Sequence, residues 1–100
     1  MKLVIYQENN PTFRVDDNKK VYEKSQYHKV YEDTVINYFG NPGIEDRVAL
    51  EILFEDFNRA TKPESYKGHS LSVGDIVEIG NTAYICDSIG WNEINLKGGQ

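Results

Sequence analysis

The chain has 100 residues, of which 39% are hydrophobic and 12% aromatic, and this allows one domain, residues 1–100, with a single core. Its 16 acidic and 11 basic side chains give a net charge of −5, which disfavours direct binding to nucleic acid and is read first as a source of solubility. A single cysteine cannot form an internal disulfide, and the apolar run at residues 3–6 is far too short to span a bilayer, so we expect a protein of the reducing cytoplasm that does not enter a membrane.

Strand signals occupy the N-terminal part of the chain. Residues 2–7 place Leu, Val, Ile and Tyr in succession before a polar cluster that contains a proline, which predicts a strand. A short strand is expected through Phe13 and Val15, ahead of a turn at residues 16–18. Residues 27–35 alternate without a clean apolar face, but their Tyr and Val content favours a strand over a helix.

One main helix is predicted over residues 45–59, after a clear break at residues 40–43. Its apolar residues recur at i, i+3, i+4 and i+7 and form a single stripe of Leu50, Leu53, Phe54 and Phe57. Val48 and Ile52 lie outside this stripe, so the helix either is buried on two sides, which is the commoner arrangement, or presents a small apolar surface to a partner. The helix is expected to end at Thr61-Lys62-Pro63.

The C-terminal part predicts a hairpin and a third strand. Residues 76–79 and 82–86 are β-forming runs joined by Gly80-Asn81, a pair that accepts the positive φ of a tight turn. Residues 89–96 are expected to add a strand, and residues 97–100 are expected to fray. These elements together predict an α+β fold, in which a small, mostly antiparallel sheet carries one helix packed on a face.

The candidate catalytic residues are His69, Cys86 and Asp87. One cysteine and two histidines far apart in the sequence do not supply four spaced zinc ligands, so no metal is expected. No glycine-rich loop has the spacing of a phosphate site, so no cofactor is expected either. Cys86 follows Ile85 in an apolar strand, which favours a buried and inert thiol, whereas a pairing with His69 would make it a nucleophile.

Three carboxylates are candidates for acid–base chemistry if the hairpin brings them together, namely Asp75, Asp87 and Glu93. Asp75 follows a glycine and opens a strand, so hydrogen bonding within a turn is the favoured interpretation, and the same reasoning extends to Asp87. Trp91 is expected to close the core, with an exposed binding aromatic as the alternative.

Two blocks of the sequence resemble the YodL-like domain family. Residues 66–77 resemble the order Tyr-x-Gly-x-Ser-Leu-Ser-Val-x-Asp-[Val or Ile]-Val, and residues 84–91 resemble Tyr-[Tyr or Val]-x-Asp-Ser-x-Gly-[Phe or Trp]. The resemblance is strongest over residues 65–94. It implies an association with Firmicutes genomes, conjugative elements and phages, and it brings no established catalytic residues.

We therefore predict a small cytoplasmic protein from a mobile genetic element that acts through contact with a protein partner rather than as an enzyme. The expected contact surface comprises Val48, Ile52 and Trp91. One alternative is an acidic decoy that binds a DNA-processing protein in place of DNA, as antirestriction proteins do. The other alternative is a small enzyme that uses His69, Cys86 or Asp87.

Overall fold

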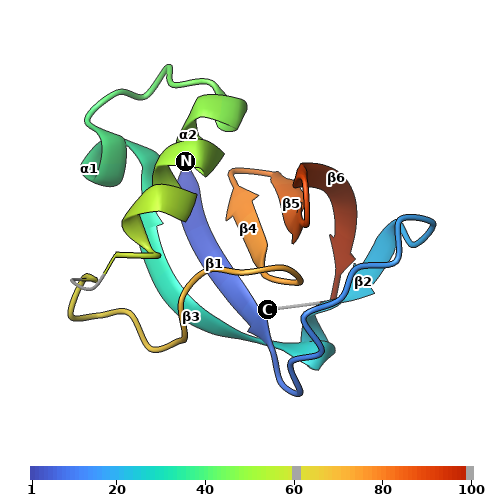
Figure 1. The fold of residues 1–100 in the computed structure, drawn as a ribbon. Helices are drawn as coiled ribbons and strands as arrows, with labels where there is room; N and C mark the ends of the chain where they lie inside the picture. Colours follow the sequence, from blue (N-terminus) through green and yellow to red (C-terminus); the bar gives the residue numbers. More distant parts are fainter. Residues whose placement is uncertain (60–61, 99–100) are drawn as a thin grey trace.

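The computed structural model describes residues 1–59 and 62–98 (Figure 1). Within these ranges the chain forms six β-strands, two α-helices and one 3₁₀ turn. The strands are β1 (Lys2–Glu8), β2 (Val21–Glu23), β3 (Tyr27–Thr34), β4 (Ile76–Ile79), β5 (Thr82–Asp87) and β6 (Gly90–Lys97). The helices are α1 (Val35–Phe39) and α2 (Asp46–Asp56), and the 3₁₀ turn η1 covers Lys24–Gln26.

The six strands form one curled sheet with the order β2-β6-β5-β4-β1-β3. Four neighbouring pairs are antiparallel and the β2–β6 pair is parallel, so the sheet is mixed rather than purely antiparallel. β2 and β3 stand at opposite ends of this order, yet only the three residues of η1 separate them in the chain. Because three residues reach about 10 Å, the sheet has to curl until its two edges approach each other (Figure 1).

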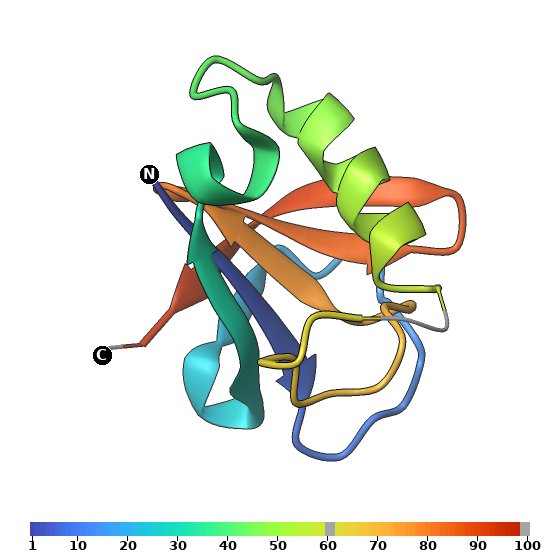
Figure 2. The same cartoon turned by 90° about the vertical axis from the view of Figure 1, so that its left-hand side faces the viewer.

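Side chains alternate across the sheet and build two buried clusters. The first cluster contains Leu3 and Ile5 from β1 together with residues of α2, among them Leu50 and Leu53. The second cluster contains Tyr22, Ile76, Ala83, Ile85 and Ile94, from β2, β4, β5 and β6. Figure 2 shows α2 on one side of the sheet, and β2, the edge strand next to β6, contributes Tyr22 to the second cluster. The chain therefore buries apolar residues on both faces of its sheet.

Elements with strong local signals are confirmed. β1 and β3 occupy the predicted positions, and the predicted hairpin forms from β4 and β5. Gly80 takes the expected positive φ, at 61°, in the turn between them. The third C-terminal strand is confirmed as β6, shifted by one residue, and Trp91 packs partly buried against the first cluster, as expected of a residue that closes the core.

Several predictions along the chain are wrong at the level of single elements. No strand passes through Phe13 and Val15; the short strand lies later, at β2, where β6 supplies its hydrogen-bonding partner. α1 is an additional short helix that begins where β3 ends, with the Thr34 hydroxyl accepting a hydrogen bond from the Asn37 backbone N–H. A hydroxyl at this position is a favourable N-cap.

The main helix is shorter than predicted and exposes part of its stripe. α2 ends at Asp56, and Phe57 leaves the helix but stays fully buried. Phe54 keeps 40% of its surface exposed and Val48 keeps 47%, so Phe54 does not belong to the buried stripe and burial of the helix on two sides is wrong at Val48. Thr61 and the last two residues of the expected frayed tail lie outside the described residues.

Neither α-helix in the described part of the chain has the length and apolarity required to cross a membrane.

Candidate functional site

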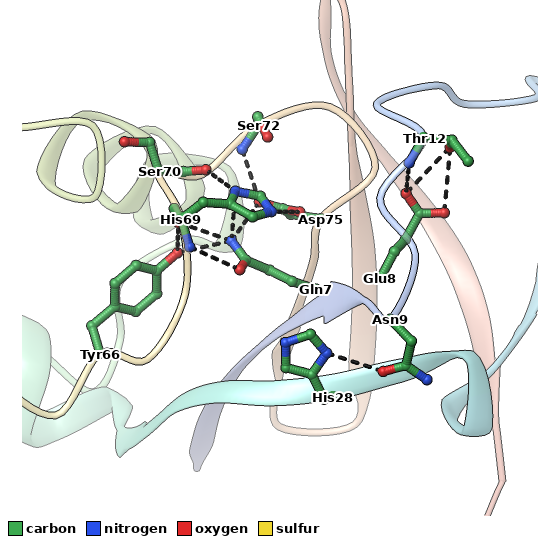
Figure 3. A network of polar contacts seen from close by, with 10 residues as sticks. All are labelled: Gln7, Glu8, Asn9, Thr12, His28, Tyr66, His69, Ser70, Ser72 and Asp75. Atoms are coloured by element: carbon green, nitrogen blue, oxygen red, sulfur yellow. Dashed lines mark hydrogen bonds and ion pairs between the residues drawn. The ribbon is translucent and has the colours of Figure 1, made fainter.

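A buried polar network centres on Gln7, a β1 side chain with 1% of its surface exposed (Figure 3). Its Nε2 donates to Asp75 Oδ2 at 3.0 Å, and lies 3.0 Å from the carbonyl oxygen of His69 and 2.9 Å from the Tyr66 hydroxyl. Its Oε1 accepts the backbone N–H of His69 at 3.1 Å. A buried amide without partners would cost several kcal/mol, so these bonds fix residues 66–75 against β1.

Gly68 is required at the point where this segment meets Gln7. A Cβ on Gly68 would overlap Gln7 Oε1 and would approach a methyl of Val30 to 2.9 Å, so no larger residue fits without displacing the amide. The neighbouring Lys67 N–H donates to the Val30 carbonyl at 2.9 Å, which ties the segment to β3 as well. The Tyr66 ring meets the ring of Phe57 edge-on, with 4.7 Å between centroids, and so connects the network to the end of α2.

Asp75 closes a turn, as the sequence predicts. Its Oδ2 accepts the Ser72 backbone N–H at 2.8 Å, while its own backbone N–H donates to the Ser72 carbonyl at 3.0 Å. The carboxyl group is almost fully buried, with 3% of the residue exposed. Burial raises its pKa to about 6, although the bonds from Ser72 and Gln7 and the neighbouring His69 act in the opposite direction.

His69 is the solvent-facing member of the network, with 37% of its side chain exposed. Its Nδ1 lies 2.6 Å from the Ser70 carbonyl oxygen and 3.2 Å from Gln7 Nε2. The shorter contact favours a hydrogen on Nδ1, because a carbonyl only accepts. Its Nε2 lies 4.0 Å from Asp75 Oδ1. The ring of Phe13 meets the imidazole edge-on at 5.5 Å. The imidazole of His69 therefore lies beside the buried carboxyl group of Asp75, without a hydrogen bond between the two side chains.

Cys86 is buried, as predicted, and its thiol is held in the neutral form. Burial, followed by the nearby carboxylates of Asp75 and Asp87, raises the pKa of the thiol to about 12. The Cys86 backbone N–H donates to the Asp75 carbonyl at 2.8 Å, so the residue adjoins the network through its main chain. No hydrogen bond joins the side chains of Cys86 and His69 within residues 1–59 and 62–98.

The remaining predicted site residues lie apart from Gln7. Asp87 sits at the turn between β5 and β6, where its carboxylate accepts the Ser88 backbone N–H at 2.6 Å and the Asn92 amide at 3.0 Å. The Ser88 bond is the main reason for its lowered pKa. Glu93 stands opposite Tyr84 in the ladder. Asp75 and Asp87 share no hydrogen bond among the described residues, and each serves its own turn.

The open spaces around the sheet lie elsewhere. A cavity of about 440 Å³ is lined by Val4, Tyr6 and Glu78, together with Lys2, Lys24 and Lys29, and His69 does not contribute to its lining. No three His, Cys, Asp or Glu side chains are grouped to hold a metal ion in the described ranges.

The sequence interpretation did not single out Gln7 or Tyr66, although a signal for Gln7 was available. Leu3, Ile5 and Gln7 occupy alternate positions of β1, so Gln7 continues the row that faces the first cluster. A polar residue in such a row requires a polar partner from another part of the chain. The sequence assigns the partner, Asp75, to a local turn or to acid–base chemistry, and neither interpretation predicts its bond to Gln7.

Comparison with known proteins gives a family and one viral relative. The family model described as "YodL-like domain" matches residues 3–96. The chain is 33% identical to a protein of Acanthamoeba polyphaga mimivirus named "Uncharacterized protein R785", over an alignment that covers 97% of this chain and 95% of the relative. No solved structure matches the chain.

Proposed function

From the premise that this chain belongs to the YodL-like domain family, we propose that it acts in the cytoplasm as a binding module of a mobile or viral genome, through contact with a protein partner. A viral relative that this chain covers over 95% of its length supports this genomic setting. The structure supports a contact through the outward face of α2, defined here as Val48, Glu51, Ile52, Phe54 and Glu55.

The observation that carries the proposal is the arrangement of apolar and acidic residues on this face. Positions one turn apart on a helix lie above one another, so Glu51 and Glu55 form an outer ridge while Val48 and Ile52 form a row beside it. Phe54 lies on the other side of the ridge. Large apolar side chains left in water on both sides of a charged ridge are typical of a surface that becomes covered on binding.

The ridge also indicates the charge of the partner. Carboxylates at the rim of an interface favour a partner that places lysine or arginine opposite them, and such pairs speed association more than they add affinity. Within α2 the Glu55 carboxylate is partly offset by Arg59, whose guanidinium lies 3.5 Å away, so Glu51 carries the larger share of this attraction.

Site-specific crosslinking tests the proposal. A photoreactive residue is placed at position 48 or 54 in the native host, with position 18, an exposed turn residue, as the control. We expect one discrete protein adduct from positions 48 and 54, none from position 18, and loss of the adduct when Glu51→Lys is added. Crosslinks of equal yield from position 18, or none from α2, would contradict the proposed surface.

A second candidate function is a small enzyme, and one observation favours it. The exposed imidazole of His69 lies 4.0 Å from the buried carboxyl group of Asp75, whose pKa is raised by burial, and such a combination is found in general acid–base sites. In this form the enzyme would use His69 with Asp75, while Cys86 and Asp87 stay outside the pair. The acidic decoy stays a prediction; competition with duplex DNA for a DNA-processing protein would test it.

A further inference from the structure

A second cavity, of about 340 Å³, is lined by the end of β1, the loop from β1 to β2, β2 itself and the start of β3. It shares no lining residue with the 440 Å³ cavity or with the network around Gln7. Its volume lies at the lower end of the range for small-molecule pockets in proteins. The lining residues that bear on its chemistry are Glu8, Arg14, Asp16, Lys19, Tyr22 and Tyr27.

Tyr22 is the most buried residue of this lining, with 5% of its surface exposed. Its hydroxyl oxygen is buried and has no hydrogen-bond partner within residues 1–59 and 62–98. The ring is enclosed by two other lining residues: Lys19 Nζ lies 4.6 Å from its centroid, and the Tyr27 ring meets it edge-on at 6.5 Å. A buried hydroxyl without a partner is unfavourable, so this group requires a partner from outside the chain.

The surroundings of the Tyr22 hydroxyl favour a positively charged partner. Burial, followed by the carboxylate of Asp16 and those of other acidic residues that include Glu8, raises the pKa of Tyr22. The hydroxyl is therefore neutral near pH 7 and keeps its oxygen lone pairs as acceptors, in a negative field. An ammonium group has three N–H donors, and the Tyr22 oxygen with these two carboxylates supplies three acceptors.

Arg14 adds a positive group to the same cavity. Glu8 is already bonded by the Thr12 backbone N–H at 3.1 Å (Figure 3), and Asp16 by the Asn18 N–H at 2.9 Å. The Arg14 guanidinium, in contrast, makes no ion pair in the part of the chain that the structure describes. A guanidinium matches a carboxylate through two parallel hydrogen bonds. The cavity thus presents acceptors for an ammonium group and donors for a carboxylate.

We propose that this cavity binds a free α-amino acid. The ammonium group of the ligand bonds the Tyr22 hydroxyl and the carboxylates beside it, its carboxylate pairs with Arg14, and its side chain lies against the Tyr27 ring. Two acidic and two basic residues in the lining suit a ligand that carries one charge of each sign. The site is separate from the outward face of α2 and does not depend on the proposed protein contact.

Titration of the whole chain with three related compounds tests the site. L-phenylalanine carries both charged groups, whereas phenylacetate lacks the ammonium group and phenethylamine lacks the carboxylate. We expect phenylalanine to shift the NMR signals of the Tyr22 and Tyr27 rings saturably, and the other two compounds to bind at least about tenfold more weakly. Equal binding of either partial compound would overturn the proposal, and so would the absence of saturable shifts with both phenylalanine and leucine.

Tyr22→Phe removes the hydroxyl and keeps the ring. We expect phenylalanine to bind about tenfold more weakly, while the urea midpoint of the free protein stays the same or rises because no bond is lost. Tyr38→Phe is the matched control: its hydroxyl bonds Asp56 at 2.7 Å, outside the cavity, so its loss should lower the midpoint and leave binding unchanged. Unchanged binding by Tyr22→Phe, or a lowered midpoint, would overturn the role of the hydroxyl.

Arg14→Gln separates the two ends of the ligand. It should weaken the binding of phenylalanine about tenfold and leave that of phenethylamine unchanged, because only phenylalanine has a carboxylate. Arg47→Gln, an exposed position on α2, makes the same change in net charge and should leave both affinities unchanged. Equal weakening of both compounds by Arg14→Gln, or of phenylalanine by both variants, would overturn the pairing with Arg14.

Discussion

At the scale of single residues, three fixed positions of the family resemblance, Tyr66, Gly68 and Asp75, belong to one network. Tyr66, Gly68 and Asp75 all contact Gln7, or leave space for it, whereas His69 stands at a position that the resemblance leaves open. These shared positions are therefore ones that attach residues 66–75 to β1. The contact between His69 and Asp75 is a property of this chain, since it depends on His69.

The close approach at Gly68 gives a prediction on stability. Gly68→Ala pushes a methyl group against Gln7 Oε1 and should lower the free energy of unfolding by about 1–3 kcal/mol. In a Gln7→Ala background the same substitution should cost less, because the atom that it displaces is gone. Urea unfolding of the two single variants and the double variant measures this coupling, and additive losses would show that Gln7 is not the obstacle.

The buried carboxyl group of Asp75 makes the stability of the whole protein depend on pH. Its pKa is raised in the folded state, so the folded protein is favoured by protonation and its stability falls as the pH rises through about 4 to 6. Asp75→Asn should remove this slope and add about 1–3 kcal/mol near pH 7.5. Urea unfolding at pH 4 and pH 7.5 measures it; a variant that is weaker at pH 7.5 would mean that the charge itself stabilises the turn.

Cys86 gives a third prediction at this scale. A thiol that is buried, with its pKa raised to about 12, reacts only when the chain opens, since the thiolate is the nucleophile. A thiol reagent at pH 7.5 should therefore label it only at the rate of unfolding, and rapidly in denaturant. Fast labelling of the folded protein would return Cys86 to the candidate nucleophiles.

At the scale of elements, local patterns predicted the strands that carry apolar runs and missed those defined by a partner. β4 and β5 were predictable because Gly80-Asn81 marks their turn. β2 has only three residues, and its partner β6 lies more than seventy positions away in the sequence, so nothing near Val21 signals it. α1 is one short turn that owes its start to Thr34.

The helix stripe separates into buried and exposed members, which a matched pair of substitutions can test. Leu53 is fully buried in the first cluster, so Leu53→Ala should lower the free energy of unfolding by about 2–5 kcal/mol. Phe54, its neighbour, faces outward, and Phe54→Ala should cost about 1 kcal/mol or less. Equal losses would mean that Phe54 packs against the core in solution, and would remove it from the proposed contact face.

At the scale of the whole molecule, the curl of the sheet could not be read from the sequence. It follows from the parallel pairing of β2 with β6, which brings Val21 beside Asn95, and from the short η1 link to β3. Composition does give the acidic balance, because charge is a sum over residues and needs no contacts, while the single domain stays a prediction. The candidate site was predictable only in part. Its turn at Asp75 follows from the local sequence, but its attachment to Gln7 depends on the fold.

The net charge of −5 leads to the last prediction, that the protein does not bind duplex DNA at physiological salt. Affinity for duplex DNA comes largely from lysine and arginine that displace counterions from phosphates. Here several cations are already engaged by carboxylates: Lys2 and Lys29 both contact Glu32, and Arg59 contacts Glu55. Titration of a labelled duplex at low and at moderate salt measures binding, with a basic DNA-binding domain of similar size as the positive control.

Tight binding that weakens steeply with salt would contradict both the binding-module proposal and the decoy, because each requires a surface that repels DNA. Weak binding confined to low salt would point to the lysines around the 440 Å³ cavity, and Lys24→Glu should then abolish it.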